Sequence, residues 1–394
     1  MLLSRLEKLI EELCPDGVEY TKLDNVIDYE QPSKFIVKST DYNEDFNIPV
    51  LTPGQTFILG YTNETDGIYK ANKDNPVIIF DDFTTSFHWV IFDFKVKSSA
   101  MKMLKPKNEK YCIFRYIYHV MKNIKYEPVD HTRQWKEKYS KFSIPVPPLE
   151  VQREIVRILD NFIELTAELT AELTARKKQY EYYRDNLLAF DGKNVEWKKL
   201  GDISIDMYRG AGIKRDQVTE KGISCVRYGE IYTSYDISFR ECKSHTNEKE
   251  IQSKKYFEYG DILFAITGES VEEIAKSIVY LGDDKCLAGG DVVVMKHNQN
   301  PRYLSYALST TSAQMQKSKG KVKSKVVHSS VPALKEILVP IPSLEEQERI
   351  ADILDDFHDL CNDISEGLPA EIEARKKQYE YYRDKLLAFK ELNS

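Results

Sequence analysis

One stretch of sixteen residues occurs twice in this chain, and this duplication limits the possible folds more than any other feature. Residues 175–190 read ARKKQYEYYRDNLLAF, and residues 374–389 repeat them with one substitution, Lys385 in place of Asn186. An internal repeat of this kind indicates that the chain is built from two related halves.

Two further pairs of segments match between the halves, and they follow the same order. VEYTKL near the start of the first half resembles VEWKKL in the second, and IPVPPLE resembles VPIPSLE. A glutamine follows each proline-rich segment at the same spacing. The sequence therefore predicts a tandem duplication whose halves diverge between these anchors. The matched ranges are 18–23 with 195–200 and 144–160 with 339–355.

The end of each half has the pattern of a long helix. Apolar residues recur there at alternating intervals of four and three, the spacing of a coiled-coil seam. A continuous helix over 149–190 would be about 60 Å long. We expect the two helices to pair, with a bend or break in the second at Gly367 and Pro369. The predicted seam residues are Ile155, Leu159, Phe162, Leu169, Leu173, Tyr180, Tyr183, Leu187, Ile350, Leu354, Phe357, Ile372, Tyr379, Tyr382 and Leu386.

The first helix also contains the tetrad Thr-Ala-Glu-Leu twice in succession, at 166–173. Each tetrad would lengthen a helix by about 6 Å and disturb the seam little. The second helix has four more residues than the first between its phenylalanine and the ARKKQ segment. Most seam side chains are ordinary helix packing, but such a helix could also set a distance.

The segments between the anchors read as two mixed α/β domains, so the predicted fold class is α/β (α+β) with two globular domains and two antiparallel helices. Apolar runs bounded by turn residues predict strands. The expected strands are 76–80, 89–94, 261–266 and 291–295, and the expected short helices are 111–125 and 303–317. The predicted divisions are a helical segment at 1–14, domains at 15–148 and 191–342, and helices at 149–190 and 343–394.

The net charge of −7 hides an uneven distribution. Residues 149–174 and 343–373 together carry −14, so the rest of the chain carries +7. Clusters of basic residues in loops suit the neutralisation of DNA phosphates, although any single lysine is more often a solvated surface group. The predicted DNA-binding residues are Thr84, Thr85, Ser86, Lys97, Lys102, His131, Arg133, Trp135, Arg209, Lys214, Arg215, Arg227, Lys317, Lys319, Lys321, Lys323 and Lys325.

Catalytic and metal signatures are missing from the sequence. There is no nucleotide-binding glycine loop and no Asn/Asp-Pro-Pro-aromatic tetrad. Asp81 and Asp82 with His88 could belong to a hydrolase, but adjacent carboxylates at a strand end are usually a turn or cap. Cys242 and His245 lack a second ligand pair, so we expect no metal and no catalytic residue.

No run of eighteen apolar residues occurs, and the first thirteen residues contain three glutamates. The sequence therefore predicts a cytoplasmic protein with no membrane contact.

The anchors resemble the specificity subunit of type I restriction-modification enzymes. The proline-rich segments, the duplicated ARKKQYEYYRD helices and the Thr-Ala-Glu-Leu tetrads carry this resemblance. It implies two target-recognition domains separated by two conserved helices, with each domain reading half of a split double-stranded DNA target. It also implies two methyltransferase (modification) subunits docked on the helices, and restriction subunits that join them.

The resemblance implies that this chain binds no cofactor of its own. S-adenosylmethionine, ATP and Mg²⁺ would belong to the partner subunits. Two alternatives remain open at this stage: a coiled-coil adaptor that does not bind DNA, and a DNA enzyme with an unrecognised active site. The resemblance further implies that the N-terminal helical segment packs near the far end of the second helix.

Overall fold

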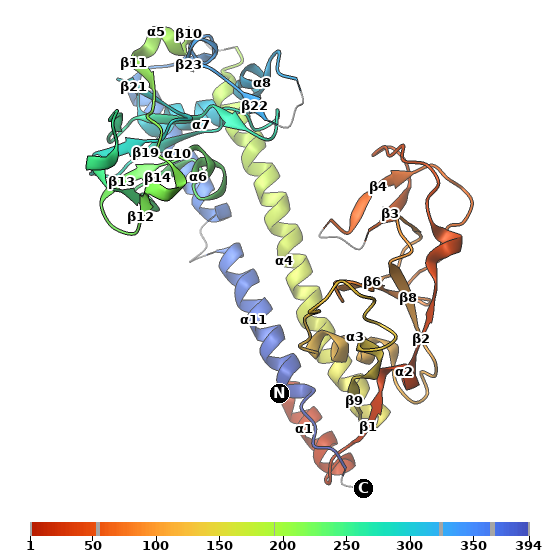
Figure 1. The fold of residues 1–394 in the computed structure, drawn as a ribbon. Coiled ribbons are helices and arrows are strands. Elements are labelled where there is room, and N and C mark those ends of the chain that lie inside the picture. The colour runs from red at the N-terminus through yellow and green to blue at the C-terminus, as the bar shows by residue number, and fades with distance from the viewer. Residues whose placement is uncertain (1, 53–55, 193, 323–325, 363–366, 393–394) are drawn as a thin grey trace. The chain divides into compact units, whose positions relative to one another are not determined.

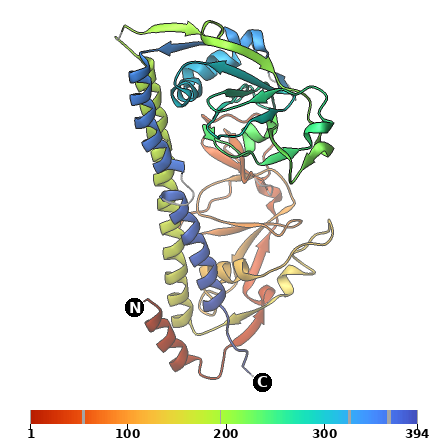
Figure 2. The same cartoon turned by 90° about the vertical axis from the view of Figure 1, so that its left-hand side faces the viewer.

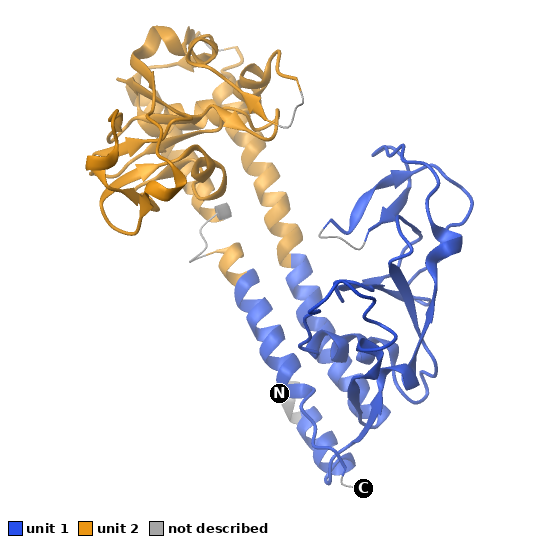
Figure 3. Cartoon of the chain, viewed as in Figure 1, with its two compact units in different colours: residues 1–168, 372–394 blue, residues 169–371 orange. Residues whose placement is uncertain are grey.

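The computed structural model of the chain describes residues 2–52, 56–192, 194–322, 326–362 and 367–392. These residues form two compact units, one of Met1–Glu168 with Ile372–Ser394 and one of Leu169–Glu371 (Figure 3). The division cuts helix α4 (Leu149–Ala189) and helix α11 (Leu368–Leu386), so each unit contains one divergent block and the helix segments packed against it. The finer domain limits predicted from the sequence stay predictions.

The repeated anchors pair with each other and close each domain. In the first unit β1 (Glu19–Lys22) pairs antiparallel with β9 (Ser143–Val146). In the second unit β10 (Glu196–Lys199) pairs in the same way with β23 (Leu338–Ile341). The two ends of each divergent block are therefore held together where the helix begins, which explains why these segments match while the sequence between them does not.

The first unit contains a four-stranded antiparallel sheet in the order β2-β8-β5-β6 and a three-stranded sheet in the order β4-β3-β7 (Figure 1). Its remaining elements are α1 (Leu2–Leu13), α2 (Leu23–Val26), β2 (Ile27–Glu30), η1 (Pro32–Phe35), β3 (Ile48–Leu51), β4 (Ile58–Thr62), β5 (Val77–Asp81), β6 (Phe87–Val90), β7 (Lys95–Val96), β8 (Met101–Pro106), α3 (Phe114–Asn123) and η2 (Tyr139–Lys141).

The second unit has two five-stranded sheets, ordered β11-β21-β17-β19-β14 and β12-β15-β13-β20-β16, and a short ribbon of β18 and β22. Its elements are α5 (Leu200–Ile203), β11 (Ser204–Arg209), η3 (Arg215–Gln217), β12 (Val218–Thr219), β13 (Ile223–Val226), α6 (Tyr228–Thr233), β14 (Ser238–Phe239), β15 (Ser244–Thr246), η4 (Glu248–Glu250), β16 (Tyr256–Phe257), β17 (Ile262–Ala265), β18 (Thr267–Gly268), β19 (Ser277–Tyr280), β20 (Cys286–Ala288), β21 (Val292–His297), α7 (Pro301–Ser309), α8 (Thr311–Ser318), β22 (Val327–His328) and α9 (Val331–Lys335).

The divergent blocks share a sheet topology that their sequences do not reveal. The strand after the first short helix pairs with the last long strand. The last long strand pairs with the central strand, and the central strand pairs with its hairpin partner. This order is β2-β8-β5-β6 in the first unit and β11-β21-β17-β19 in the second, antiparallel throughout. The central strands β5 and β17 are buried along their whole length.

Two expected elements differ from the structure. The expected helix at 303–317 is two helices, because Thr310 adopts an extended backbone and its hydroxyl accepts a hydrogen bond from the amide of Ala313, which starts α8. The expected strand at 89–94 ends at Val90, and the apolar side chains of Ile91 and Phe92 that follow are each 38% exposed.

Helix α1 packs against the end of α11, as predicted. Leu6 is buried in the same core as Leu386, and the amide of Val18 donates to the carbonyl of Lys390 at 2.8 Å. The first residues of the chain therefore complete the end of the helical layer in the first unit.

The long helices pair along the predicted seam (Figures 1 and 2). In the first unit Phe162 of α4 stacks on Tyr382 of α11 with 5.3 Å between ring centroids. In the second unit Tyr183 stacks on Phe357 of α10 (Leu344–Asn362), and Tyr180, three residues earlier, meets His358, one residue later, so the helices are antiparallel.

Seven predicted seam residues are buried: Ile155, Leu159, Tyr180, Ile350, Leu354, Ile372 and Leu386. The seam drifts near the end of α4, where Leu188 is buried and the predicted Leu187 is only half-buried. The break predicted near Gly367 is confirmed, because α10 ends at Asn362 and α11 begins at Leu368. Among the described residues, no helix is both long and apolar enough to cross a membrane.

Candidate nucleic-acid interface

In the first domain, the turn between β5 and β6 carries the predicted Thr84, Thr85 and Ser86. The carboxylate of Asp81 accepts hydrogen bonds from the amide of Phe83 at 2.9 Å and from the hydroxyl of Thr84 at 2.7 Å. Thr85 has a φ of 61°, which a tight turn can require. Asp81 is therefore a turn cap, which confirms the simpler interpretation of this acidic pair. Thr84 and Ser86 are exposed, whereas Thr85 is buried.

Asp82 joins this turn to the loop that follows α3. Its backbone carbonyl accepts from the amide of Gln134 at 2.7 Å, and its carboxylate accepts from the amide of Trp135 at 2.8 Å. The other carboxylate oxygen lies 3.0 Å from the ammonium of Lys102. One buried acid thus holds together two segments that lie about fifty residues apart in the sequence.

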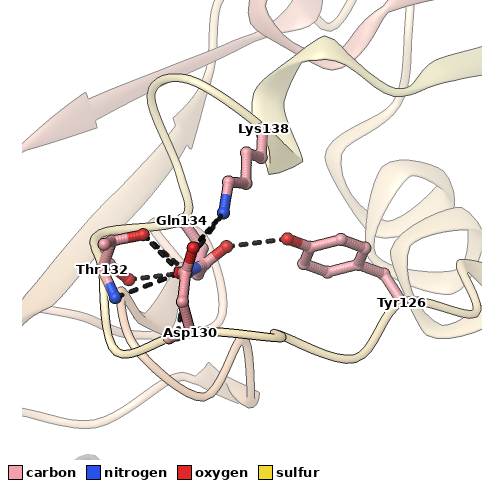
Figure 4. Close-up of polar contacts among 5 residues, drawn as sticks. All are labelled: Tyr126, Asp130, Thr132, Gln134 and Lys138. Atoms are coloured by element: carbon pink, nitrogen blue, oxygen red, sulfur yellow. Dashed lines mark hydrogen bonds and ion pairs between the residues drawn. The ribbon is translucent and has the colours of Figure 1, made fainter.

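The loop itself is organised around Asp130 (Figure 4). Its carboxylate accepts from the hydroxyl of Thr132 at 2.5 Å, from the side-chain amide of Gln134 at 3.0 Å and from the ammonium of Lys138. The hydroxyl of Tyr126 donates to Gln134 at 2.7 Å. These hydrogen bonds hold the pKa of Asp130 well below its usual range, and the bond from Thr132 has the largest effect. The loop is ordered by its own side chains, and His131 and Arg133 are exposed on it.

The structure corrects three predictions in this domain, and the first is Thr85, which is buried in the turn. Lys102 is 3% exposed and ion-paired, so it supports the turn and cannot reach a phosphate without leaving Asp82. Trp135 is 2% exposed and packs against Phe80 with 5.0 Å between ring centroids, so it belongs to the core. Lys97 is exposed, its backbone amide donates to the carbonyl of Leu51, and its ammonium donates to the hydroxyl of Tyr42.

The second domain joins the corresponding two segments by a different set of contacts. The segment after β17 forms β18, which pairs with β22 beyond the lysine cluster. The amide of Ser329 donates to the carbonyl of Ile266 at 2.8 Å, and the hydroxyl of Thr267 lies 3.2 Å from Nδ1 of His328. The ammonium of Lys321 donates to the carbonyl of His328. Both domains therefore bring the turn after the central strand against the loop that follows the helices.

The lysine cluster of this domain is only partly at the surface. Lys319 is exposed and Lys321 is half-buried, while Lys323 and Lys325 lie outside the described residues. Lys317 is 4% exposed, and its amine donates to the carbonyl of Leu308 at 2.8 Å and to the hydroxyl of Ser277 at 3.0 Å. Burial lowers the pKa of Lys317 to about 7. The prediction that Lys317 contacts DNA is therefore wrong, because its side chain fills the domain interior.

A second group of predicted basic residues lies around Gly289. The backbone segments that carry Arg227 and Arg209 approach Gly289 closely. A Cβ added to Gly289 would lie 3.2 Å from the Cα of Arg227, and a Cβ added to Gly210, next to Arg209, would lie 2.2 Å from the carbonyl oxygen of Gly289. Arg209 pairs with Asp291, and Arg227 pairs with Glu230 at 3.2 Å. Lys214 and Arg215 are exposed nearby in sequence, at the start of η3.

Sequence reasoning missed His328 and Thr267, which connect the two segments of the second domain. Their signal is present but weak: His328 follows the lysine run and precedes the Val339-Pro340 anchor, as His131 precedes the first anchor. Among the residues that the structure describes, no group of three or more His, Cys, Asp or Glu could hold a metal ion.

These features define a class of protein: two domains with a shared order of four strands, each with a turn against a segment that carries polar and basic side chains, and each packed on paired antiparallel helices. The profile described as "Type I restriction modification DNA specificity domain" matches the chain twice, over residues 15–176 and 193–374. The chain belongs to this family of type I restriction-modification specificity subunits.

Two curated relatives match along nearly their full length. The chain is 40% identical over 404 residues to the EcoR124I/EcoR124II specificity subunit of Escherichia coli, covering 98% of this chain and 97% of the relative. It is 30% identical over 407 residues to a putative type I restriction enzyme specificity subunit of Haemophilus influenzae, covering 98% of each chain. Specificity subunits are non-catalytic, so the prediction that this chain is not an enzyme is confirmed.

A solved chain from a study of complex assembly and conformational transition in the type I R-M system has the same fold. It aligns with a TM-score of 0.58 at 16% identity, over 95% of this chain and 98% of that one. Membership of the family implies DNA sequence recognition and assembly with modification and restriction subunits.

Proposed function

We propose that this chain reads a bipartite double-stranded DNA target, one half with each domain. The observation that carries the proposal is the shared design of the two candidate interfaces. In each domain the turn after the central strand is hydrogen-bonded to the loop after the helices, by Asp82 in one and by the β18–β22 pair in the other. A common scaffold with different exposed side chains suits two readers of different base sequences.

Within each interface, exposed basic side chains would neutralise phosphates and polar ones would contact base edges. In the first domain the candidates are Thr84, Ser86, His131 and Arg133, and in the second Lys319, Lys321 and His328, all at the ends of one strand hairpin or on the loop against it. Such a chain works in the compartment that holds the host DNA, which in a bacterium is the cytoplasm.

Helix α4 would set the unread spacer between the half-sites. In and next to its tetrads the hydroxyl of Thr166 donates to the carbonyl of Phe162, and that of Thr174 donates to the carbonyl of Thr170, so these two bonds lie within the helix. An extra tetrad would add about 6 Å of helix and disturb the seam little. Inserting one Thr-Ala-Glu-Leu after Leu173 should lengthen the spacer of the recognised DNA and leave both half-sites unchanged; altered half-sites would contradict the ruler.

The duplicated helices would dock two modification subunits. The repeated segments expose the same tyrosine, Tyr182 at 66% and Tyr381 at 62%, next to the same lysine and glutamine pattern. Two copies of one exposed surface suit two copies of one partner, and exposed aromatic side chains are common anchors in interfaces. S-adenosylmethionine would be bound by these partners, and ATP and Mg²⁺ by the restriction subunits.

The test is a map of modified bases in the host genome, with this gene present and then deleted. The proposal predicts that a split motif with a methylated adenine in each half disappears on deletion. An adaptor that does not bind DNA would leave every motif unchanged while still capturing the modification subunits in a pull-down.

A further inference from the structure

Each recognition domain is fastened to its long helix by an arginine and a carboxylate. In the first unit Nε of Arg115 on α3 lies 2.8 Å from Oδ1 of Asp160 on α4, and Nε2 of His119 lies 2.8 Å from the same oxygen. In the second unit Arg302 on α7 pairs with Asp355 on α10, and the hydroxyl of Tyr306 donates to Asp355 at 2.6 Å. We call these two sets of contacts the arginine locks.

The locks occupy the same place in both halves, although the sequences around them differ. The tyrosine after each arginine also makes the same bond: the hydroxyl of Tyr116 donates to the carbonyl of Pro145 at 3.0 Å, and that of Tyr303 donates to Pro340 at 2.9 Å. Asp160 and Asp355 lie at matched positions of the repeat. The Arg-Tyr pair is thus a fourth repeated feature, hidden inside the divergent blocks.

A second fastening lies at the start of each long helix. The side-chain oxygen of Gln152 accepts from the amide of Ile113 at 2.8 Å, while its amide group donates to the carbonyl of Pro147 at 2.8 Å. Gln347 accepts from the amide of Asn300 at 2.9 Å and donates to Pro342 at 2.9 Å. Both glutamine side chains are fully buried with their hydrogen bonds made.

The glutamine contact and the arginine lock lie at two separate levels of the same helix. Each glutamine precedes its aspartate by eight residues, which is about 12 Å along a helix. The domain and its helix also share an apolar core, and the arginine lock adds a directional contact about 12 Å along the helix from the glutamine, which restrains rotation of the domain on the helix.

The two arginine locks differ in the side chains that surround the arginine. Burial lowers the pKa of His119, and Nδ1 of its ring also lies 3.2 Å from the hydroxyl of Tyr379 on α11. The charged and titratable groups around it are Asp160, Arg115, Arg383 and Tyr379. Arg302 instead pairs with three acids of α10, which are Glu348, Asp352 and Asp355.

We infer that Arg115 and Arg302 are positioning residues for target recognition: each fixes the direction in which its domain presents the reading loops, and so limits the spacer lengths that the subunit accepts. This inference rests on the proposed function, because a spacer exists only if the two domains read two half-sites. A lock contacts no DNA in this account, so the bases read by each domain should not depend on it.

The test compares Arg302→Gln and Arg115→Gln with the wild-type chain, each assembled with its modification subunits. Duplexes carry the cognate half-sites separated by the cognate spacer or by one base pair more or fewer, and methylation of each is measured. We expect the ratio of off-spacer to cognate methylation to rise about tenfold, a change that loss of one charged hydrogen bond can produce. The bases required in each half-site should stay the same.

A matched control is Arg349→Gln. Arg349 lies on α10 and makes two bonds of 2.7 Å to Glu346 of the same helix, so these bonds do not link the helix to α7. Arg349→Gln should keep the strict spacer. Arg302→Lys keeps the positive charge, and its ratio of off-spacer to cognate methylation should lie between those of the wild type and Arg302→Gln. Thermal unfolding should be recorded for every variant, so that a loss of folding is recognised.

The outcomes separate the two claims. If the wild-type assembly methylates no split target, the proposed function fails and the locks are not at issue. If the wild type requires a split target and the folded Arg302 and Arg115 variants keep its spacer as strictly as the wild type, or change the bases read, the inference is overturned.

Discussion

The loop after α3 in the first domain and the segment that ends in β22 in the second are held by different contacts. The loop of the first domain is held by acidic side chains, Asp82 beneath it and Asp130 within it. The loop of the second is held by backbone pairing between β18 and β22, with Lys321 bonded to the carbonyl of His328. The comparison teaches that the scaffold fixes where a loop lies and leaves its side chains open to change. Each prediction below tests one side of this comparison.

The largest effect is expected from Asp82→Ala. The substitution leaves the ammonium of Lys102, which is 3% exposed, without its ionic partner. Breaking a buried pair in this way costs about 3–5 kcal/mol of unfolding free energy. Chemical denaturation should show the loss. The double variant Asp82→Leu with Lys102→Met should recover much of it, and an equal loss in the double variant would contradict the buried-pair account.

In the second domain the buried Lys317 predicts a dependence of stability on pH. Its pKa is about 7 in the folded chain and about 10.4 in the unfolded one, so the unfolded state binds more protons between these values. Stability should therefore rise from pH 7 to pH 10, by up to about 1.4 kcal/mol for each pH unit. Lys317→Met should remove this part of the slope. An unchanged slope in the variant would show that the amine is charged when folded.

A smaller effect is expected from Arg133→Ala, which removes an exposed guanidinium group from the loop after α3. DNA binding by the assembled complex should weaken by about 1–3 kcal/mol if the side chain contacts a base edge. If it contacts a phosphate, the slope of log affinity against log salt should fall by about one. Arg5→Ala is the control, because Arg5 is also exposed but lies on α1 and pairs with Glu154. Equal effects of the two variants would place the first loop away from DNA.

The smallest effect is expected from Asp130→Asn. The folded state holds the pKa of Asp130 below that of the unfolded chain, so its contribution is present above about pH 4 and fades as pH falls toward the lowered value. Wild type and variant should differ in thermal stability near neutral pH and converge in acid. A difference that grows on acidification would mean that other groups hold the loop.

The sequence was sufficient to predict the repeat and the paired helices with their break, and the resemblance implied the packing of α1. The anchors made this possible because β1 pairs with β9 and β10 with β23, so the matched segments were structural partners. The sequence did not distinguish Lys317 from Lys319. Lys317 is buried with its amine bonded to the carbonyl of Leu308 and the hydroxyl of Ser277. These partners lie far from the lysine run in the sequence, so the run itself does not reveal which lysine is buried.

The arginine locks escaped prediction for a related reason. Arg115-Tyr116 and Arg302-Tyr303 are short matches inside unlike sequence, and only their common bonds to Asp160 and Asp355 and to the proline carbonyls show that they are equivalent. Trp135 was predicted at the interface because its segment holds the place in the first block that the lysine cluster holds in the second, but its amide donates to Asp82 and its ring is buried in the core.

The central claim is that the two domains read their half-sites independently, and one measurement tests it most directly. The modified bases of DNA methylated by the assembled complex should be mapped for the wild type and for two variants, His131→Ala with Arg133→Ala, and Lys319→Ala with Lys321→Ala. The account predicts that each variant relaxes or loses the requirement in one half-site, a different half for each, and leaves the other half and the spacer intact. Changes in both halves from either variant, or the same half affected by both, would contradict it.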